Sequence, residues 1–195
     1  MDRWFGKVAV VTGASAGIGA AIVVDLANAG LITIGLARRV ERVEELKTKL
    51  AGDCRGQLHA MKCDVSSETD IVETFKEIEK QFGGIDILVN NAGIVRNCKL
   101  TDADNTRNIQ DTVNTNLMGL IFCTREAVQS MKKRAVDGHV ININSVAGHY
   151  QPMYAGGPIF NVYSGTKYAV TAVTETLRQE FIHLGTKIKV TVSYR

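Results

Sequence analysis

Cysteine and proline are both scarce in this sequence, and each scarcity excludes a class of protein. Only two prolines occur among 195 residues, and no proline-rich or serine-rich linker marks a second domain. The four cysteines, Cys54, Cys63, Cys98 and Cys123, lie far apart and form no Cys-x-x-Cys pair. This spacing indicates neither a zinc site nor a disulfide framework. We therefore expect a single domain over residues 1–195 with reduced, partly buried thiols.

Long hydrophobic runs and blocks of like charge are absent as well. No stretch approaches the ~20 apolar residues of a membrane span, and the apolar run near the N-terminus is too short for a secretion signal. The net charge is +3, and no run of lysine and arginine is interleaved with aromatic residues as on a nucleic-acid surface. The histidines are too scattered to form a metal site. We expect a cytoplasmic protein that binds neither nucleic acid nor membrane and holds no metal.

Short β-branched runs alternate along the chain with longer segments of helical period. This alternation is typical of βαβ units, in which helices cover both faces of a parallel sheet. The strands are expected at 7–12, 32–37, 57–63, 85–90, 140–144 and 188–193. The sequence thus predicts an α/β fold of the doubly wound type.

Helices are expected between these strands, and some of their ends are marked by capping residues. Ser67 and Asp70 are spaced as a capping box, and "TDAD" at 101–104 offers a second one. The longest amphipathic stretch, 161–184, carries an apolar stripe. We interpret this stripe as part of the core or as a face that packs against another helix.

Three glycines crowd the turn after the first expected strand, in "TGASAGIG". Each glycine costs conformational entropy, so something must approach the backbone closely there. A strand, the pattern Gly13-x-x-x-Gly17-x-Gly19 and then a helix is the setting in which a dinucleotide pyrophosphate binds the amides of a helix N-terminus. The alternative is a tight turn in which strand and helix pack closely without a ligand.

Four further motifs follow this loop: "NNAG" at 90–93, "NTNLMG" at 114–119, "NSVAG" at 144–148 and "YSGTK" at 163–167. In these residues the chain resembles the short-chain dehydrogenases/reductases across nearly its whole length. Residues 90–180 are most similar to the branch of insect farnesol dehydrogenase-like and broad-specificity carbonyl and hydroxysteroid reductases. The resemblance implies a Rossmann-type sheet with strand order 3-2-1-4-5-6, helices on both faces, and a nicotinamide cofactor.

Tyr163 and Lys167 are four residues apart on an expected helix, so their side chains share one face. A phenol has an unperturbed pKa of about 10, and a neighbouring ammonium favours its ionised form. By resemblance, Tyr163 exchanges a proton with the substrate oxygen, and Lys167 also binds the nicotinamide ribose. The resemblance further implies that Ser145 holds the substrate oxygen and that Asn116 anchors a water-linked proton relay. A tyrosine and a lysine that share a surface helix without any catalytic role are the open alternative.

The end of the second expected strand bears on the choice between NAD(H) and NADP(H). An acidic residue about 20 positions after the glycines would bind the ribose 2′-hydroxyl of NAD, but Ala37 stands there and Arg38 and Arg39 follow. Guanidinium groups pair with a 2′-phosphate, so we predict NADP(H) over NAD(H); the alternative is two solvated arginines. Asp64 and Val65 resemble the family's adenine contacts, although Asp64 could equally cap a loop. The full set of expected cofactor contacts is Gly13, Ser15, Gly17, Ile18, Gly19, Arg38, Arg39, Asp64, Val65, Asn91, Ala92, Gly93, Tyr163 and Lys167.

Two departures from the family pattern concern the substrate and the C-terminus. The interval before Tyr163 is longer than in most members and carries the apolar side chains of Tyr150, Met153, Tyr154 and Phe160. It predicts a loop over the substrate mouth and an isoprenoid- or steroid-like substrate, unless these residues only pack the loop. The family pattern also continues into a substrate-covering segment and a last edge strand. We therefore expect a truncated chain whose sixth strand is an exposed edge.

The sequence thus predicts an NADP(H)-dependent oxidoreductase that interconverts a lipophilic alcohol and its aldehyde or ketone. By resemblance we also expect a homodimer formed through the helices near 105–130 and 161–184. The competing interpretation is a catalytically inactive dinucleotide-binding or interaction protein. The intact motifs favour the enzyme, whereas the expected lack of the substrate-covering segment and the last strand favours the inactive dinucleotide-binding protein.

Overall fold

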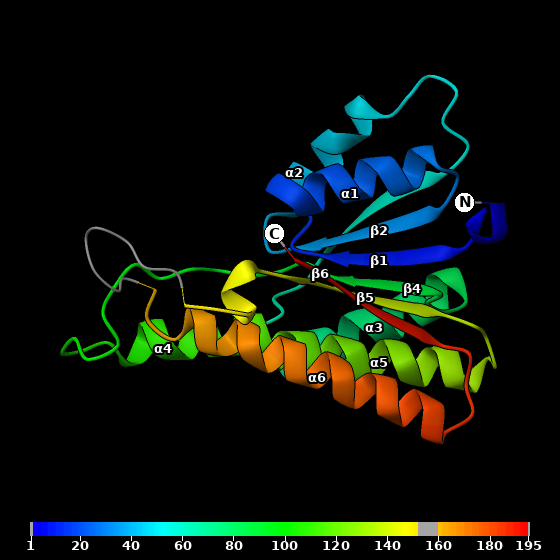
Figure 1. The fold of residues 1–195 in the computed structure, drawn as a ribbon. Helices are drawn as coiled ribbons and strands as arrows, with labels where there is room; N and C mark the ends of the chain where they lie inside the picture. The colour runs from blue at the N-terminus through cyan, green and yellow to red at the C-terminus, as the bar shows by residue number, and fades with distance from the viewer. Residues whose placement is uncertain (1, 152–159, 195) are drawn as a thin grey trace.

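The computed structural model describes residues 2–151 and 160–194 as one parallel sheet flanked by helices (Figure 1). The strands are β1 (Val8–Thr12), β2 (Ile32–Ala37), β3 (Gln57–Lys62), β4 (Ile87–Asn90), β5 (His139–Asn144) and β6 (Lys189–Tyr194). They lie in the order β3-β2-β1-β4-β5-β6, and each neighbouring pair is parallel. The predicted fold class and strand order are confirmed, and the strand ends agree with the prediction to within one or two residues.

Helices cover both faces of the sheet. They are α1 (Gly17–Asn28), α2 (Val40–Glu44), α3 (Glu68–Phe82), α4 (Thr106–Val113), α5 (Gly119–Lys133) and α6 (Tyr163–His183). The short helical turns are η1 (Asp2–Trp4), η2 (Glu45–Lys49), the π-helical η3 (Asn114–Met118) and η4 (Val146–Gly148). Figure 1 shows α1 and α2 on one face and α3, α5 and α6 on the other. No described helix is both long enough and apolar enough to cross a membrane.

Consecutive side chains of the central strands enter opposite cores. On β1, Ala9 and Val11 belong to the core that α1 covers, whereas Val8 and Val10 belong to the core under α3, α5 and α6. All five residues of β1 are buried, which explains why the strand reads as a continuous apolar run rather than an alternating one.

The thiols and the other side chains that could bind a metal are dispersed. All four cysteines are free. Cys63 and Cys123 are buried, and burial raises the pKa of the Cys63 thiol to about 11 and also raises that of Cys123. Both thiols are therefore protonated at neutral pH and pack as small hydrophobic groups. Within residues 2–151 and 160–194, no group of three or more His, Cys, Asp or Glu side chains is placed to hold a metal ion.

The capping box expected at α3 forms only in part. The Ser67 hydroxyl accepts a hydrogen bond from the Asp70 amide at 3.3 Å, as predicted. The Asp70 carboxylate does not return to Ser67 but accepts the Asp64 amide at 2.7 Å. Asp70 therefore fastens the turn after β3 to the start of α3.

The second expected capping box, "TDAD" at 101–104, is wrong. The helix begins later, at Thr106, because Asp104 has a φ of 57°, outside the helical region. Asp102 instead accepts the Lys99 amide at 2.8 Å. These residues form a turn that leads into α4 rather than the cap of the helix.

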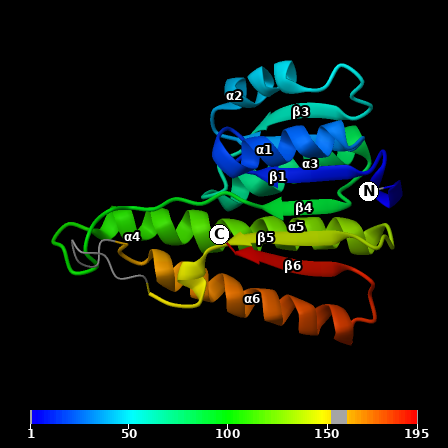
Figure 2. The ribbon, with the colours of Figure 1, turned by 45° about the horizontal axis from the view of Figure 1, so that its top comes forward.

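The chain reverses its direction of travel through the sheet at β1 and β4. From β1 it moves outward to β3, and it then crosses back to β4 and continues outward to β6. Right-handed crossovers therefore place the helices after β1 and β4 on opposite faces, which opens a crevice at the carboxyl ends of these two strands. In Figure 2, α4 extends beyond the sheet at that same edge.

Candidate active site

The glycine-rich loop joins β1 to α1 at this crevice. Gly13 and Gly17 have φ values of 68° and 55°, which residues with a Cβ rarely adopt. A Cβ atom at Gly13 would also lie 2.8 Å from Ala92 Cα, and one at Gly19 would collide with the Asn91 amide. Close packing inside the chain therefore accounts for Gly13 and Gly19 without a ligand.

Gly17 differs from the other two glycines. Its Cβ would have no described atom within 4 Å, so the space in front of the first residue of α1 is open. A ligand can therefore approach the backbone here.

The N-terminus of α1 is not neutralised by the part of the chain that is described. Ala16 at the N-cap offers no side-chain acceptor, and the first turn contains no acidic residue. By contrast, α3 is capped by Ser67 and carries Glu68 and Asp70 in its first turn. Since the first amides of a helix lack helical partners and bear partial positive charge, the start of α1 fits an anion such as a pyrophosphate.

Thr12 and Asn91 fasten the glycine loop to the end of β4. The Thr12 hydroxyl accepts the amides of Asn91 and Ala92 at 3.0 Å each. The Asn91 side-chain amide donates to the carbonyl oxygens of Thr12 and Gly13 at 2.9 and 3.2 Å. These bonds fix the two walls of the crevice relative to each other. The sequence did not lead us to expect this role for Thr12, although its hydroxyl directly before Gly13 could have indicated it.

A cavity of about 380 Å³ opens at the crevice and contains most of the expected cofactor contacts. It is lined by Gly13, Ser15, Ile18, Arg38, Arg39, Asp64, Val65, Asn91, Ala92 and Gly93. The lining residues that sequence reasoning did not assign to the cofactor are Ala16, Leu36, Ala37, Cys63, Ile94 and Thr115. Four expected contacts lie outside its lining: Gly17, Gly19, Tyr163 and Lys167.

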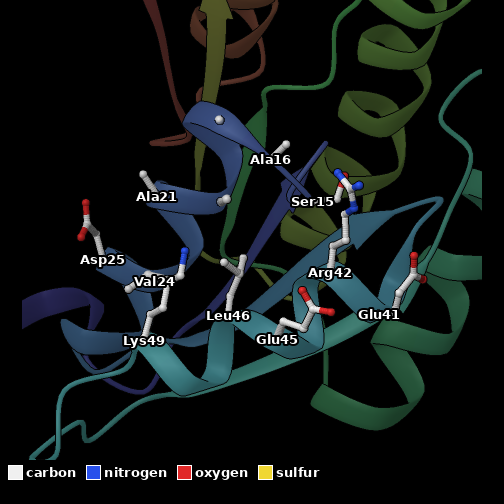
Figure 3. A pocket seen from close by; sticks show the side chains of 12 residues that line it. Ser15, Ala16, Ala21, Val24, Asp25, Glu41, Arg42, Glu45, Leu46 and Lys49 are labelled. Atoms are coloured by element: carbon white, nitrogen blue, oxygen red, sulfur yellow. The ribbon is translucent and has the colours of Figure 1, made fainter.

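A larger groove of about 860 Å³ lies beside this cavity, between α1 and the segment α2–η2 (Figure 3). The groove shares Ser15 and Ala16 with the smaller cavity. Its lining carries three carboxylates, of Asp25, Glu41 and Glu45, and two cationic side chains, of Arg42 and Lys49 (Figure 3). The smaller cavity instead carries the two arginines and the single carboxylate of Asp64. Because positive charge attracts phosphate groups, this balance of charge favours the smaller cavity for a dinucleotide.

Arg38 and Arg39 follow β2 directly and are exposed at the rim of the smaller cavity. Neither guanidinium has an ion-pair partner among the described residues, whereas Arg125 pairs with Glu68 at 2.8 Å. Both guanidinium groups are therefore available to an anionic ligand.

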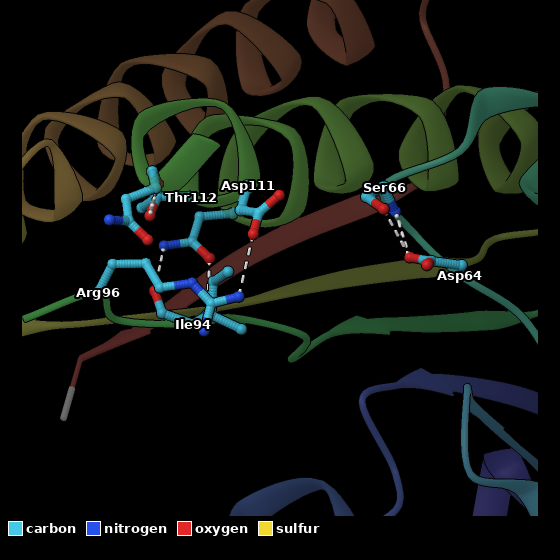
Figure 4. A network of polar contacts seen from close by, with 8 residues as sticks. Asp64, Ser66, Ile94, Arg96, Asp111 and Thr112 are labelled. Atoms are coloured by element: carbon cyan, nitrogen blue, oxygen red, sulfur yellow. Dashed lines mark hydrogen bonds and ion pairs between the residues drawn. The ribbon is translucent and has the colours of Figure 1, made fainter. Parts of the chain in front are cut away.

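Asp64 lines the cavity and also shapes the turn after β3. Its carboxylate accepts the Ser66 amide at 3.0 Å and the Ser66 hydroxyl at 2.7 Å (Figure 4). Asp64 thus has the loop-capping role that the sequence left open. That role does not prevent the same residue from bordering a bound nucleotide.

Asn116 lies in the π-helical turn η3, where Gly119 donates to the Asn114 carbonyl oxygen five residues earlier. The buried side chain of Asn116 accepts the Ile94 amide at 2.8 Å and donates to the Ile94 carbonyl oxygen at 2.9 Å. Its amide nitrogen also lies 3.3 Å from Thr166 Oγ1 on α6. Figure 4 shows Ile94 beside the Arg96–Asp111 ion pair. Asn116 therefore connects the segment after β4 with α6, at the kind of helical irregularity that often marks a functional site.

Lys167 is 7% exposed, and Nζ donates to the Ile143 carbonyl oxygen at 3.0 Å. Nζ also lies 5.8 Å from the centre of the Tyr163 ring. A Cβ atom at Gly93 would lie 4.0 Å from Nζ and 3.6 Å from Asn116 Oδ1. Burial lowers the pKa of Lys167 from 10.5 to about 8. The structure thus places Lys167 and Asn116 beside Gly93 in the lining of the smaller cavity, with the Tyr163 ring near Lys167.

Ser145 and Tyr163 both lie at the carboxyl edge of the sheet. Ser145 follows β5 directly, and its hydroxyl accepts the Ala147 amide at 3.2 Å. Tyr163 begins α6, and its ring centre lies 6.0 Å from that of Phe160. The described structure has no hydrogen bond between Ser145 and Tyr163, and the Ser145 hydroxyl, which accepts the Ala147 amide, still has its own proton to donate.

The expected apolar loop falls mostly outside the described residues. Pro152, Met153, Tyr154 and Pro158 all belong to the stretch 152–159 that is not described. On its flanks, Tyr150 is exposed and Phe160 packs against Tyr163. Two further apolar side chains of this edge are exposed as well: Val95 and Val146. Exposed apolar side chains therefore form part of the described mouth of the site, next to exposed polar residues such as Asn97 and His149.

Replacing Lys167 with methionine is expected to stabilise the fold at neutral pH. In the folded chain Lys167 loses its proton near pH 8, whereas in the unfolded chain it does so near 10.5. Below pH 8 the folded state therefore bears the full cost of a buried ammonium, roughly 3 kcal/mol, and this cost disappears as the pH rises to 10.5. Loss of the bond to Ile143 offsets roughly 1 kcal/mol.

We expect Lys167→Met to raise the free energy of unfolding by about 2 kcal/mol at pH 7, with little difference left at pH 10. Urea unfolding at both pH values measures this change. The exposed Lys76→Met serves as control and should alter stability at neither pH. A Lys167→Met variant that is less stable than the parent at pH 7 would contradict the assigned burial cost.

Comparison with known proteins gives the same architecture. Residues 7–194 match the family described as short chain dehydrogenase. The chain is 57% identical over 191 residues to a farnesol dehydrogenase of Aedes aegypti, covering 98% of this chain and 77% of that protein. A short-chain dehydrogenase/reductase of Burkholderia phymatum in complex with NAD superimposes with a TM-score of 0.85 at 25% identity, over 100% of this chain and 66% of the other. A metagenomic short-chain oxidoreductase in complex with NADP also gives 0.85, at 28% identity, over 97% and 82%.

Proposed function

This chain belongs to the short-chain dehydrogenase family, and on that basis we propose that it is an NADP(H)-dependent oxidoreductase of lipophilic alcohols and their carbonyl counterparts. The coarser part follows from the family: the protein is an oxidoreductase that interconverts alcohols and carbonyl compounds. The assignment of the reacting residues rests chiefly on one observation. The buried Lys167 lies 5.8 Å from the Tyr163 ring centre, at the sheet edge where the cavity opens.

The residues of the crevice suit a nicotinamide dinucleotide. The uncompensated start of α1 accommodates the pyrophosphate, and Ser15 and Ala16, which precede the helix, line the cavity. Asp64, Val65 and Asn91 to Gly93 border the remainder of the cavity. At its rim, the guanidinium groups of Arg38 and Arg39 have no ion-pair partner among residues 2–151 and 160–194, and Ala37 stands where NAD-binding sites carry an acidic residue. Both features support NADP(H) over NAD(H).

When bound, the nicotinamide group supplies or accepts a hydride at the substrate carbon. In reduction, the Tyr163 hydroxyl gives its proton to the carbonyl oxygen, and in oxidation the phenolate takes the proton of the alcohol. The Lys167 ammonium lies 5.8 Å from the Tyr163 ring centre, one helical turn further along α6, and is held there by its bond to the Ile143 carbonyl oxygen.

Ser145 and Asn116 complete the proposed set. The Ser145 hydroxyl stands at the end of β5, where it can hold the substrate oxygen. Asn116 fixes the position of η3 against Ile94 and α6, and from there it would anchor the proton relay. Neither residue has to change its charge in this scheme.

The exposed apolar side chains at the mouth of the site and the similarity to a farnesol dehydrogenase support an isoprenoid-like substrate. Each buried CH₂ group contributes about 0.8 kcal/mol. For a series of primary aldehydes of increasing isoprenoid length, kcat/KM for NADPH-dependent reduction is expected to rise by about tenfold or more per added unit. Aldehydes of similar size with hydroxylated chains are the control. A kcat/KM that is flat or falls with isoprenoid length would exclude a lipophilic substrate.

A homodimer through α4–α5 and α6 completes the proposal. On α6, the apolar stripe divides between core and surface: Val170 and Phe181 are buried, whereas Leu184 is exposed. Tyr168 and Ile182 also expose apolar surface on this helix. Association with a second copy would cover these side chains.

A further inference from the structure

Both ends of Lys167 are held by consecutive residues of one strand. The ammonium donates to the Ile143 carbonyl oxygen at 3.0 Å. The main-chain carbonyl oxygen of Lys167 accepts the side-chain amide of Asn144 at 3.1 Å. Ser145 is the next residue along the chain. Two successive residues, Ile143 and Asn144, therefore bind the two ends of Lys167, and the next residue, Ser145, is the proposed contact of the substrate oxygen.

Asn144 is buried, with 3% of its surface exposed, and its amide nitrogen also donates to Thr171 Oγ1 at 3.0 Å. Its side-chain oxygen is buried without a hydrogen-bond partner in the described structure, which is unfavourable for stability. The Lys167 carbonyl oxygen would not be left unpaired without Asn144, because Thr171 Oγ1 lies 3.3 Å from it. Stability alone therefore gives little reason for an asparagine at this position.

Gly148, in η4, also borders the Lys167 carbonyl group, and we call Asn144 and Gly148 together the seat of Lys167. A Cβ atom there would lie 2.8 Å from the Lys167 carbonyl oxygen and 2.9 Å from Asn144 Nδ2, so any side chain would press into this hydrogen bond. The first asparagine and the last glycine of "NSVAG" at 144–148 thus act on the same contact from two sides. The contact therefore explains the first and last residues of this motif, Asn144 and Gly148, whereas the proposed function assigns a role only to Ser145.

Asn142 provides a matched comparison on the same strand. Its side-chain amide donates to Thr174 Oγ1 on α6 at 2.9 Å, so it links β5 to α6 as Asn144 does. It is equally buried. Its bond, however, reaches α6 about two turns beyond Lys167. Asn142 can therefore support the helix without fixing the residues that react.

We infer that Asn144 and Gly148 are positioning residues, which set the first turns of α6 against β5 so that Tyr163 and Lys167 face the Ser145 hydroxyl. Tyr163 lies one turn before Lys167 on the same helix, so any displacement of the helix moves both side chains relative to Ser145. A displacement of about 1 Å is enough to cost roughly 10²-fold in rate. The inference concerns the proposed catalytic set and deepens the proposed function.

The test compares two variants of the seat, Asn144→Leu and Gly148→Ala, with two controls, Asn142→Leu and Thr176→Val, in which the exposed Thr176 hydroxyl donates to the Ala172 carbonyl oxygen of the same helix. We expect each seat variant to lower kcat for NADPH-dependent reduction by 10- to 100-fold, on the order set by such misplacement, and to leave the NADPH Kd within about threefold. The controls should keep kcat within about threefold. Asn142→Leu should lower Tm at least as much as Asn144→Leu, because both the oxygen and the nitrogen of the Asn142 side chain are hydrogen-bonded, to Asn90 and Thr174.

A second readout needs neither cofactor nor turnover. The titration of Lys167 is followed by NMR on protein labelled at the lysine side chains, starting from a pKa of about 8 in the parent. We expect Asn144→Leu and Gly148→Ala to move this pKa toward 10.5, because the ammonium loses its buried position, and Asn142→Leu to leave it unchanged.

Two results would overturn the inference: parental kcat and parental Lys167 titration in Asn144→Leu, or equal losses of kcat in Asn142→Leu and Asn144→Leu. A parent chain that binds NADPH but never oxidises it would instead refute the proposed function. In that case the NMR titration alone shows whether Asn144 and Gly148 position Lys167. Failure of the inference and failure of the proposed function can therefore be told apart.

Discussion

Replacing Tyr163 with phenylalanine is expected to lower kcat for NADPH-dependent reduction by about 10³-fold. The substitution removes the hydroxyl that carries the proton, and general acid–base catalysis by one side chain contributes about 10²- to 10⁴-fold. The ring itself is retained, so its packing against Phe160 and its contact with Lys167 persist. NADPH affinity should therefore stay within about threefold of the parent, as measured by fluorescence titration, while steady-state kinetics report the loss of turnover.

Tyr168→Phe is the matched control for this experiment. Tyr168 lies on the same helix, is exposed, and donates its hydroxyl proton to the His149 carbonyl oxygen. The control deletes the same atom from the same residue type and should leave kcat within about threefold. Unchanged turnover in Tyr163→Phe would show that another group moves the proton, and the mechanism would then be wrong.

Replacing Arg38 with aspartate is expected to lower the preference for NADPH over NADH by roughly 10²- to 10³-fold. The substitution removes a charge-assisted contact worth about 1.5–3 kcal/mol and places a carboxylate beside the 2′-phosphate. The same carboxylate can accept a hydrogen bond from the ribose 2′-hydroxyl of NADH. The preference is measured as the ratio of kcat/KM values for the two nucleotides with one carbonyl substrate.

Arg55→Asp controls for the change in net charge. Arg55 is also exposed, but it precedes β3 and so lies at the amino edge of the sheet, opposite the crevice. It should leave the ratio within about twofold. If Arg38→Asp also leaves the ratio unchanged, Arg38 does not read the 2′-phosphate, and Arg39→Asp then tests whether its neighbour does.

The order of the strands and the place of the crevice could be predicted from sequence because they depend on local patterns. Apolar runs such as that of β1 and turn glycines such as Gly13 report the strand and the bend that follows it, whatever the rest of the chain does. The parallel arrangement then brings the carboxyl ends of β1 and β4 together. Residues after these strands, including Asn91 and Gly93, therefore met at the crevice as expected.

Contacts between distant side chains could not be predicted in this way. The π-helical turn around Asn116 depends on its two hydrogen bonds with Ile94, which comes from another element. The expected box in "TDAD" failed for a local reason, because Asp104 has a φ of 57° and the Asp102 carboxylate accepts the Lys99 amide before the helix begins. The lowered pKa of Lys167 likewise arises from burial, which neither its spacing from Tyr163 nor its residue type reveals.

Transfer of deuterium from labelled cofactor to product tests the central claim most directly. The purified chain is incubated with an isoprenoid aldehyde and NADPH that carries deuterium at the transferable nicotinamide position, and the product alcohol is analysed by mass spectrometry. We expect deuterium on the carbinol carbon, transferred much faster from NADPH than from NADH and almost absent from the product of Tyr163→Phe. If the chain binds NADPH and yet no deuterium reaches the alcohol, it is a dinucleotide-binding protein without turnover, and the proposed function is wrong.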